Sequence, residues 1–228
     1  MATTIIVSYD GTESDRDALA LGSLLTRAGA TLELAYVRHA QEAESGRERL
    51  AEHEAEALLA AGAAALGQPD LPRHVVLSGS TAAGLRDLAL AREADMIVFG
   101  SEYRTARGHV DPQASAKRLI DGGPVAVGLA PAGFAEQAEP SIASILAVEE
   151  EGDPCPLETA EALAGKLGAT VASQASRDVD LLVVGSKPGT VTGRVTVSAA
   201  AAYVVELATC PVLVLPRGVA IHFNGGAG

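Results

Sequence analysis

An internal repeat constrains the fold of this chain more than any other feature of its sequence. The run Asp95–Ser101 (DMIVFGS) returns 85 positions later as Asp180–Ser186 (DLLVVGS). Similarly, Gly123–Leu129 (GPVAVGL) resembles Cys210–Pro216 (CPVLVLP). Each run is short and aliphatic and lies beside glycine or proline, which is typical of a strand buried in a parallel sheet. The repeat therefore predicts two copies of one structural unit.

The first copy alternates strand-like runs with longer segments of helical period. Strands are expected at residues 4–9, 31–37, 74–78, 95–99 and 124–129, and helices at about 12–28, 42–66, 81–92 and 113–120. Such an alternation predicts a parallel sheet with helices on both faces.

The spacing between the two copies changes along the chain. Gly29 precedes Gly168 by 139 positions, and Asp10 precedes Glu149 by the same distance. The later offset of 85 means that the second copy lacks 54 residues before the run that begins at Asp180. In the first copy, this interval holds the second helix, the third strand and the third helix.

About eight residues, Gln174 to Leu181, replace the missing segment. They can recross a sheet but are too few to form a helix that covers it. One face of the second sheet is therefore predicted to be bare, and an apolar bare face is a binding surface. The first lobe or another chain would cover it; the alternative is a small lobe with poor cover.

The repeat divides the chain into two lobes. Residues 1–131 form the first lobe, 132–141 a linker, 142–217 the truncated second lobe and 218–228 a tail. The last strand of each lobe, at 124–129 and 211–215, is apolar and would be an unprotected sheet edge on its own. We therefore expect these strands to lie side by side and antiparallel, so that the lobes pack as an internal pseudo-dimer.

Composition argues against several classes of function. The chain has 17 Lys and Arg against 29 Asp and Glu, a formal net charge of -12, and no Trp. It therefore offers neither a basic surface nor aromatic platforms, and nucleic acid is not an expected partner. The two cysteines and five histidines lack the spacing of a metal site. No apolar run is long enough to span a membrane and no leader is recognisable, so a cytoplasmic location is expected.

Several motifs carry a resemblance to a known family. They are Ile6-Val7-x-x-Asp10-Gly11-Thr12, Gly79-x-x-Ala82, the run Asp95–Ser101 with its repeat, and Cys210-Pro-Val-Leu-Val. With these motifs the chain resembles the universal stress protein family in its tandem form. The resemblance implies an α/β fold with two HUP-like (adenine nucleotide alpha hydrolase-like) open parallel sheets in strand order 3-2-1-4-5. The second copy would lack its second helix, third strand and third helix.

ATP-binding members of that family carry G-x2-G-x9-G-[ST] after the fourth strand, where glycine lets backbone N–H groups approach the phosphates. In the first lobe, Gly100 and Ser101 begin the pattern. However, Tyr103 stands at the second glycine, and Gln113-Ala114 stands at the final pair.

The second lobe departs from the same pattern. Gly185 matches, whereas Pro188 and Ser198-Ala199 replace the other positions. The cofactor that the resemblance implies is ATP or another adenine nucleotide with Mg. Because both lobes lack the later glycines, ATP binding of the usual kind is not expected.

The loop that follows Asp180–Ser186 nevertheless has the composition of an anion site. It combines glycines, hydroxyls and two cations without a carboxylate, so a phosphate-bearing ligand is predicted to bind here rather than at the first-lobe loop. The residues concerned are Gly185, Ser186, Lys187, Gly189, Gly193, Arg194 and Ser198. The alternative is a flexible connection in which Ser198 caps the next helix.

Asp10 ends the first strand, where the resemblance implies an adenine contact. Its alternative role is an Asx turn with Gly11. Glu149 replaces it in the second lobe and is followed by Glu150 and Glu151, which are expected to form a solvated loop.

The sequence as a whole predicts a non-enzymatic regulatory or binding module with a weak nucleotide or anion site. Two alternatives stay open: an ATP-binding or ATP-hydrolysing member of the same fold, and an interaction platform without ligand. The partners to consider are a small nucleotide or anion, another protein, and a second copy of the chain.

Overall fold

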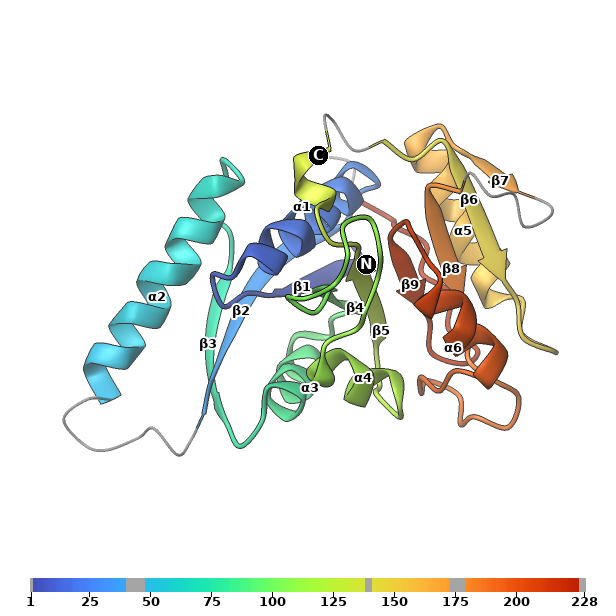
Figure 1. The fold of residues 1–228 in the computed structure, drawn as a ribbon. Helices are drawn as coiled ribbons and strands as arrows, with labels where there is room; N and C mark the ends of the chain where they lie inside the picture. The colour runs from blue at the N-terminus through green and yellow to red at the C-terminus, as the bar shows by residue number, and fades with distance from the viewer. Residues whose placement is uncertain (1, 40–47, 138–140, 173–178, 226–228) are drawn as a thin grey trace.

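A computed structural model of the chain describes residues 2–39, 48–137, 141–172 and 179–225. Its centre is a nine-stranded sheet in the order β3-β2-β1-β4-β5-β9-β8-β6-β7 (Figure 1). The first copy of the repeat supplies the strands from β3 to β5, and the second copy supplies those from β9 to β7.

The first half confirms the predicted alternation. Its elements are β1 (Thr4–Ser8), α1 (Glu13–Arg27), β2 (Thr31–His39), α2 (Glu48–Ala65), β3 (Arg73–Ser78), α3 (Thr81–Arg92), β4 (Met96–Gly100), α4 (Ala114–Ile120) and β5 (Ala126–Ala130). Every neighbouring pair of these strands is parallel, in the predicted order 3-2-1-4-5. Residues 42–47, predicted as the start of the second helix, lie outside the described residues.

The second half has the shortened form that the offsets indicated. A 3-10 turn, η2 (Phe134–Glu136), precedes β6 (Ser144–Val148), α5 (Cys155–Leu167), β7 (Thr170–Ala172), β8 (Leu181–Val184), α6 (Ala199–Glu206) and β9 (Val212–Val214). The order β9-β8-β6-β7 is that of the first half without its outermost strand. Residues 174–178 of the short connection lie outside the described residues.

The halves join through their last strands, as predicted. β5 and β9 are antiparallel, with Gly128 opposite Leu213. This pairing protects both edges with backbone hydrogen bonds and turns the two expected sheets into one continuous sheet.

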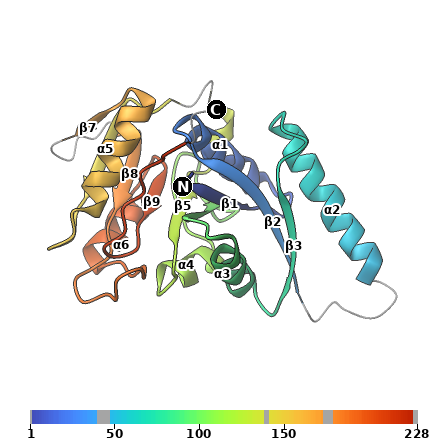
Figure 2. The same cartoon turned by 180° about the vertical axis from the view of Figure 1, so that it is seen from behind.

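Helices cover the sheet in two layers. α1, α2 and α5 lie on one face (Figure 2), and α3, α4 and α6 lie on the other (Figure 1). In Figure 1, α6 lies in front of the β8–β9 side, whereas none of the helices described there covers β6 and β7 on this face. The part of the bare-face prediction that invoked the first lobe is wrong, because β9 and β8 separate that lobe from β6 and β7.

The predicted linker and tail both carry buried residues. Within 132–137, Phe134 is only 3% exposed, and residues 138–140 lie outside the described part. In the tail, Ile221 and Phe223 belong to the core on the α1 side of the sheet, and Gly225 lies against the backbone of Gly29. The chain end therefore crosses from the second half to the first (Figure 2).

Candidate functional site

The loops that follow β4 and β8 are built in the same way. Ser101 Oγ donates to the carbonyl oxygen of Ala130 at 2.7 Å, and Ser186 Oγ donates to that of Leu215 at 2.7 Å. Each hydroxyl also accepts from the backbone N–H ten residues further along the chain. Both serines are buried and hold the loop to the end of the last strand.

Each loop is also tied to the opposite half. The backbone N–H of Val110 donates to the carbonyl of Ala208 at 3.2 Å, and that of Val195 donates to Gly123 at 2.9 Å. All four residues are related by the offset of 85. The loops that carry the candidate residues are therefore part of the junction between the halves.

The predicted anion-binding residues of the second half have different surroundings in the structure: some face solvent and one contacts the first half. Arg194 Nη1 donates to the carbonyl of Gly122 in the first half at 3.2 Å. Lys187 is exposed. Gly189 and Gly193 adopt φ of 81° and 78°, and an added Cβ would meet nothing within 4 Å at either position. The loop therefore has the open backbone expected of it, while its arginine makes a junction contact.

A carboxylate lies at the start of α6. Ser198 Oγ accepts from the N–H of Ala201 at 3.1 Å, which is the capping role named as the alternative. The same hydroxyl donates to Glu150 at 2.5 Å. A negative charge is favourable there because the first N–H groups of a helix are unpaired.

This arrangement corrects two expectations. In the sheet register, Ile145 lies opposite Leu181, just as Ile5 lies opposite Met96 in the first half. Ile145 is therefore the counterpart of Ile5, and the offset between the two copies at this strand is one position larger than the predicted 139. Glu150, rather than Glu149, is thus the counterpart of Asp10. It is also half-buried instead of lying in a solvated loop, because its side chain reaches Ser198.

Asp10 itself is engaged at the start of α1. Its Oδ1 accepts from the N–H of Thr12 at 3.2 Å, which is an Asx turn. Its own N–H donates to the buried carboxylate of Asp15 at 2.6 Å. Burial, together with the neighbouring Asp10, raises the pKa of Asp15 to about 7.

The third glycine position of the family's ATP-binding pattern in the first half is also occupied by a side chain. Gln113, which stands at the third glycine position, donates from Nε2 to Ser14 Oγ at 3.4 Å and to the carbonyl of Ser101 at 3.5 Å. An added Cβ at Gly100 would lie 1.9 Å from the carbonyl oxygen of Ser14, so α1 packs directly on the end of β4. Gly100 is required here for close packing.

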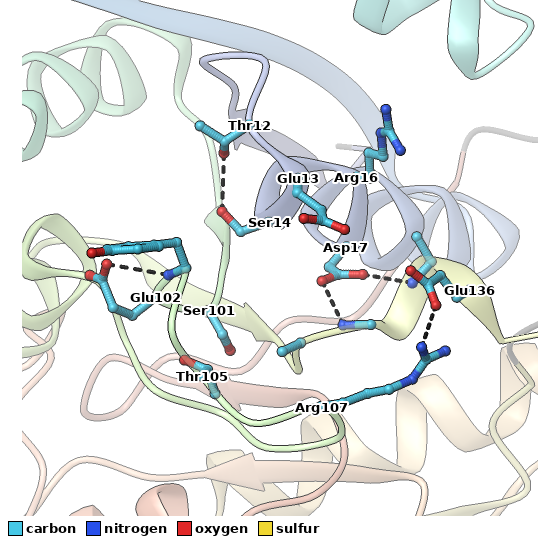
Figure 3. Close-up of a pocket in the computed structure, with 14 residues that line it drawn as sticks. Thr12, Glu13, Ser14, Arg16, Asp17, Ser101, Glu102, Thr105, Arg107 and Glu136 are labelled. Carbon is cyan, nitrogen blue, oxygen red and sulfur yellow. Dashed lines mark hydrogen bonds and ion pairs between the residues drawn. The ribbon is translucent and has the colours of Figure 1, made fainter.

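A cavity of about 470 Å³ opens beside this point, between the start of α1, the loop after β4 and residues 132–136 (Figure 3). Asp17 accepts from the N–H groups of Gly133 and Ala135 at 2.8 Å each. Burial raises the pKa of Asp17. Arg107 pairs with Glu136 across the rim. The cavity thus has polar walls with charges of both signs.

Sequence reasoning missed these cavity residues. Asp17 and Arg107 are far apart in sequence and follow no motif; both line the cavity, where each contacts residues 132–136. Thr105 gave no signal either, although its Oγ1 is buried without a hydrogen-bond partner and the residue also lines a second cavity of about 800 Å³ between α4 and α6.

Neither cysteine is activated as a nucleophile. Burial raises the pKa of both Cys155 and Cys210 to about 12, so each stays a thiol at neutral pH. Among the residues that the structure describes, no three His, Cys, Asp or Glu gather into a possible metal site. In that same part of the chain, no helix is both long and apolar enough to cross a membrane.

Comparison with known proteins identifies the family. The model of the universal stress protein family matches residues 1–127, which is more than half of the chain. The chain belongs to the universal stress protein family. The resemblance drawn from the motifs is therefore confirmed.

Solved structures extend the family's fold across both halves. A universal stress protein from Archaeoglobus fulgidus DSM 4304 is similar with a TM-score of 0.68 and 15% identity, covering 94% of this chain and 98% of that one. A functionally unknown protein from Pseudomonas aeruginosa PAO1 gives a TM-score of 0.61 at 14% identity, covering 95% and 93%. At these identities the likeness concerns the fold alone. No curated protein matches the chain.

Proposed function

We propose that this universal stress protein is a non-enzymatic regulatory module that binds phosphate-bearing ligands only weakly. The observation that carries the proposal is that the chain's own side chains take up the nucleotide positions of the family pattern. In the first half, Gln113 bridges Ser14 and Ser101. In the second half, Glu150 bonds to Ser198 at the start of α6.

Weak binding follows from the competition at α6. A phosphate that approaches Lys187 and the open backbone of Gly189 and Gly193 must displace or tolerate the carboxylate of Glu150. The helix start and the loop favour an anion, whereas Glu150 repels it. A phosphate-bearing ligand therefore gains little binding free energy, because it replaces the contact that Glu150 already makes with Ser198.

Calorimetry with Mg-ATP and with inorganic phosphate tests the proposal. We expect weak binding by the wild type, strengthened on the order of fivefold by Glu150→Gln, which removes the competing charge but keeps a hydrogen-bonding side chain. Lys187→Ala should weaken binding by about 10- to 150-fold, the loss of one charge-assisted hydrogen bond, because Lys187 is exposed whereas Arg194 contacts Gly122. Equal affinities in all three proteins would show that this loop is not the site.

A turnover assay tests the non-enzymatic part separately. We expect no ATP hydrolysis above the uncatalysed rate in the wild type. Hydrolysis that a single substitution abolishes would establish the enzyme alternative, whatever the affinity. Gln113→Gly should be assayed beside the wild type, because this substitution restores one glycine of the family's ATP-binding pattern in the first half.

A further inference from the structure

A cavity of about 800 Å³ lies between α4 and α6. The two helices lie on the same face of the sheet, on either side of the junction between β5 and β9 (Figure 1). This volume falls in the range of small-molecule sites, roughly 300–1,000 Å³, and such sites often form between domains. Neither the nucleotide pattern of the family nor the proposed phosphate loop accounts for this cavity.

The internal repeat supplies apolar walls from both halves. The offset of 85 relates Pro112 to Val197, and Ile120 to Val205, and all four residues line the cavity. Val205 is buried and the other three are half-buried. A ligand in this position would therefore bury apolar surface against both halves of the chain at once, which is favourable in water.

The loop after β4 bounds the cavity on one side. The repeat counterparts of its lining residues, at 189–191 and 194–195, take no part in the walls. The N–H of Val110 donates to the carbonyl of Ala208 at 3.2 Å, so the end of α6 holds this loop in place. The cavity is thus bounded by a loop as well as by two helices. The loop residues that line it are Arg104, Thr105, Ala106, His109, Val110, Asp111 and Pro112.

The charges of the lining nearly cancel. Lys117 pairs with Asp111 at 3.0 Å. Arg104 then stands against two carboxylates, Asp121 and Glu206, which the repeat places in opposite halves. Both carboxylates are exposed, so water and salt screen them. An ion of either sign would lose hydration against the apolar walls without gaining a strong opposite charge, and the lining therefore favours an uncharged ligand.

We propose that this cavity binds an uncharged, mainly apolar small molecule that contacts both halves of the chain. The volume is sufficient for a compound of drug-like size. The lining includes Thr196 and Val197, which directly precede Ser198 at the start of α6. The ligand therefore lies beside the end of the proposed phosphate loop, but it uses none of the residues proposed to bind phosphate.

The fluorescence of N-phenyl-1-naphthylamine, an uncharged probe that emits strongly in apolar surroundings, tests the proposal on the full chain. We expect saturable binding by the wild type. Ala202→Phe should weaken it at least about tenfold, because the added ring fills the cavity from α6. Ala106→Phe should do the same from the loop after β4. Ala200→Phe is the matched control, since Ala200 lies on α6 outside the lining, and it should leave the affinity unchanged.

Displacement of the probe tests the class of ligand. Three compounds of similar size differ in charge: 1-methylnaphthalene is neutral, naphthalene-1-sulfonate is an anion and 1-naphthylmethylamine is a cation at neutral pH. We expect the neutral compound to displace the probe at the lowest concentration. More effective displacement by either ion would overturn the assignment to an uncharged ligand.

The location fails on other results. Absence of saturable binding, or equal affinities in the wild type and the three variants, would overturn the proposal, as would equal weakening by Ala200→Phe. Thermal unfolding of the variants should match the wild type, because all three positions are exposed, and this separates lost binding from lost folding. Inorganic phosphate should not displace the probe, so this proposal and the proposed function fail independently.

Discussion

At the scale of single residues, the carboxyl group of Asp15 makes stability depend on pH. Asp15 is 4% exposed, and burial together with Asp10 raises its pKa from 3.8 to about 7. The folded chain therefore holds this proton more tightly than the unfolded chain does. The stabilisation is fully present below about pH 4 and is lost as the pH rises through about 7. We expect the free energy of unfolding of the wild type to fall over this range relative to that of Asp15→Asn.

Urea denaturation at several pH values between these limits measures the difference. Asp87→Asn is the control, because Asp87 lies on the surface beside Arg86. Its difference from the wild type should not follow the same trend. A wild-type curve parallel to that of Asp15→Asn would show that Asp15 is ionised throughout.

At the scale of elements, continuous aliphatic runs made the strands predictable. A strand buried on both faces has apolar residues throughout, instead of alternating polar and apolar ones. Asp95–Ser101 and its repeat became β4 and β8, and the pairing of β5 with β9 followed from their apolar edges. The one-residue shift that puts Glu150 in the place of Asp10 was not predictable. It depends on the register of β6 against β8, which packing decides.

Two glycines give an element-scale prediction. Gly193 has φ of 78° in the loop after β8, a conformation that other residues adopt only with strain. Gly165 lies within α5, and an added Cβ would meet nothing within 4 Å. Gly193→Ala should cost about 1–2 kcal/mol of stability, whereas Gly165→Ala should add roughly 0.5–1 kcal/mol. Chemical denaturation of both variants compares them, and changes of the same sign would contradict the backbone argument.

At the scale of the whole molecule, two contacts join the halves in addition to the hydrogen bonds between the junction loops. One is the β5–β9 pair, which the sequence predicted. The other is the tail, which the repeat had defined only as the residues that follow the second lobe. The N–H of Ile221 donates to Thr159 of α5 at 2.9 Å, and Phe223 is fully buried in the core that α1 and α5 share. The tail therefore links the second half to the turn at Gly29.

Phe223 should accordingly matter to both halves. Phe223→Ala leaves a cavity in the shared core and is expected to cost about 3–5 kcal/mol of unfolding free energy. Val219, at 38% exposed in the same segment, provides the control: Val219→Ala should change stability by less than about 0.5 kcal/mol. Hydrogen exchange locates the effect, because loss of the anchor should raise exchange in the α1–β2 turn and in α5 together. Faster exchange in the tail alone, with stability unchanged, would mean that β5 and β9 hold the halves together without it.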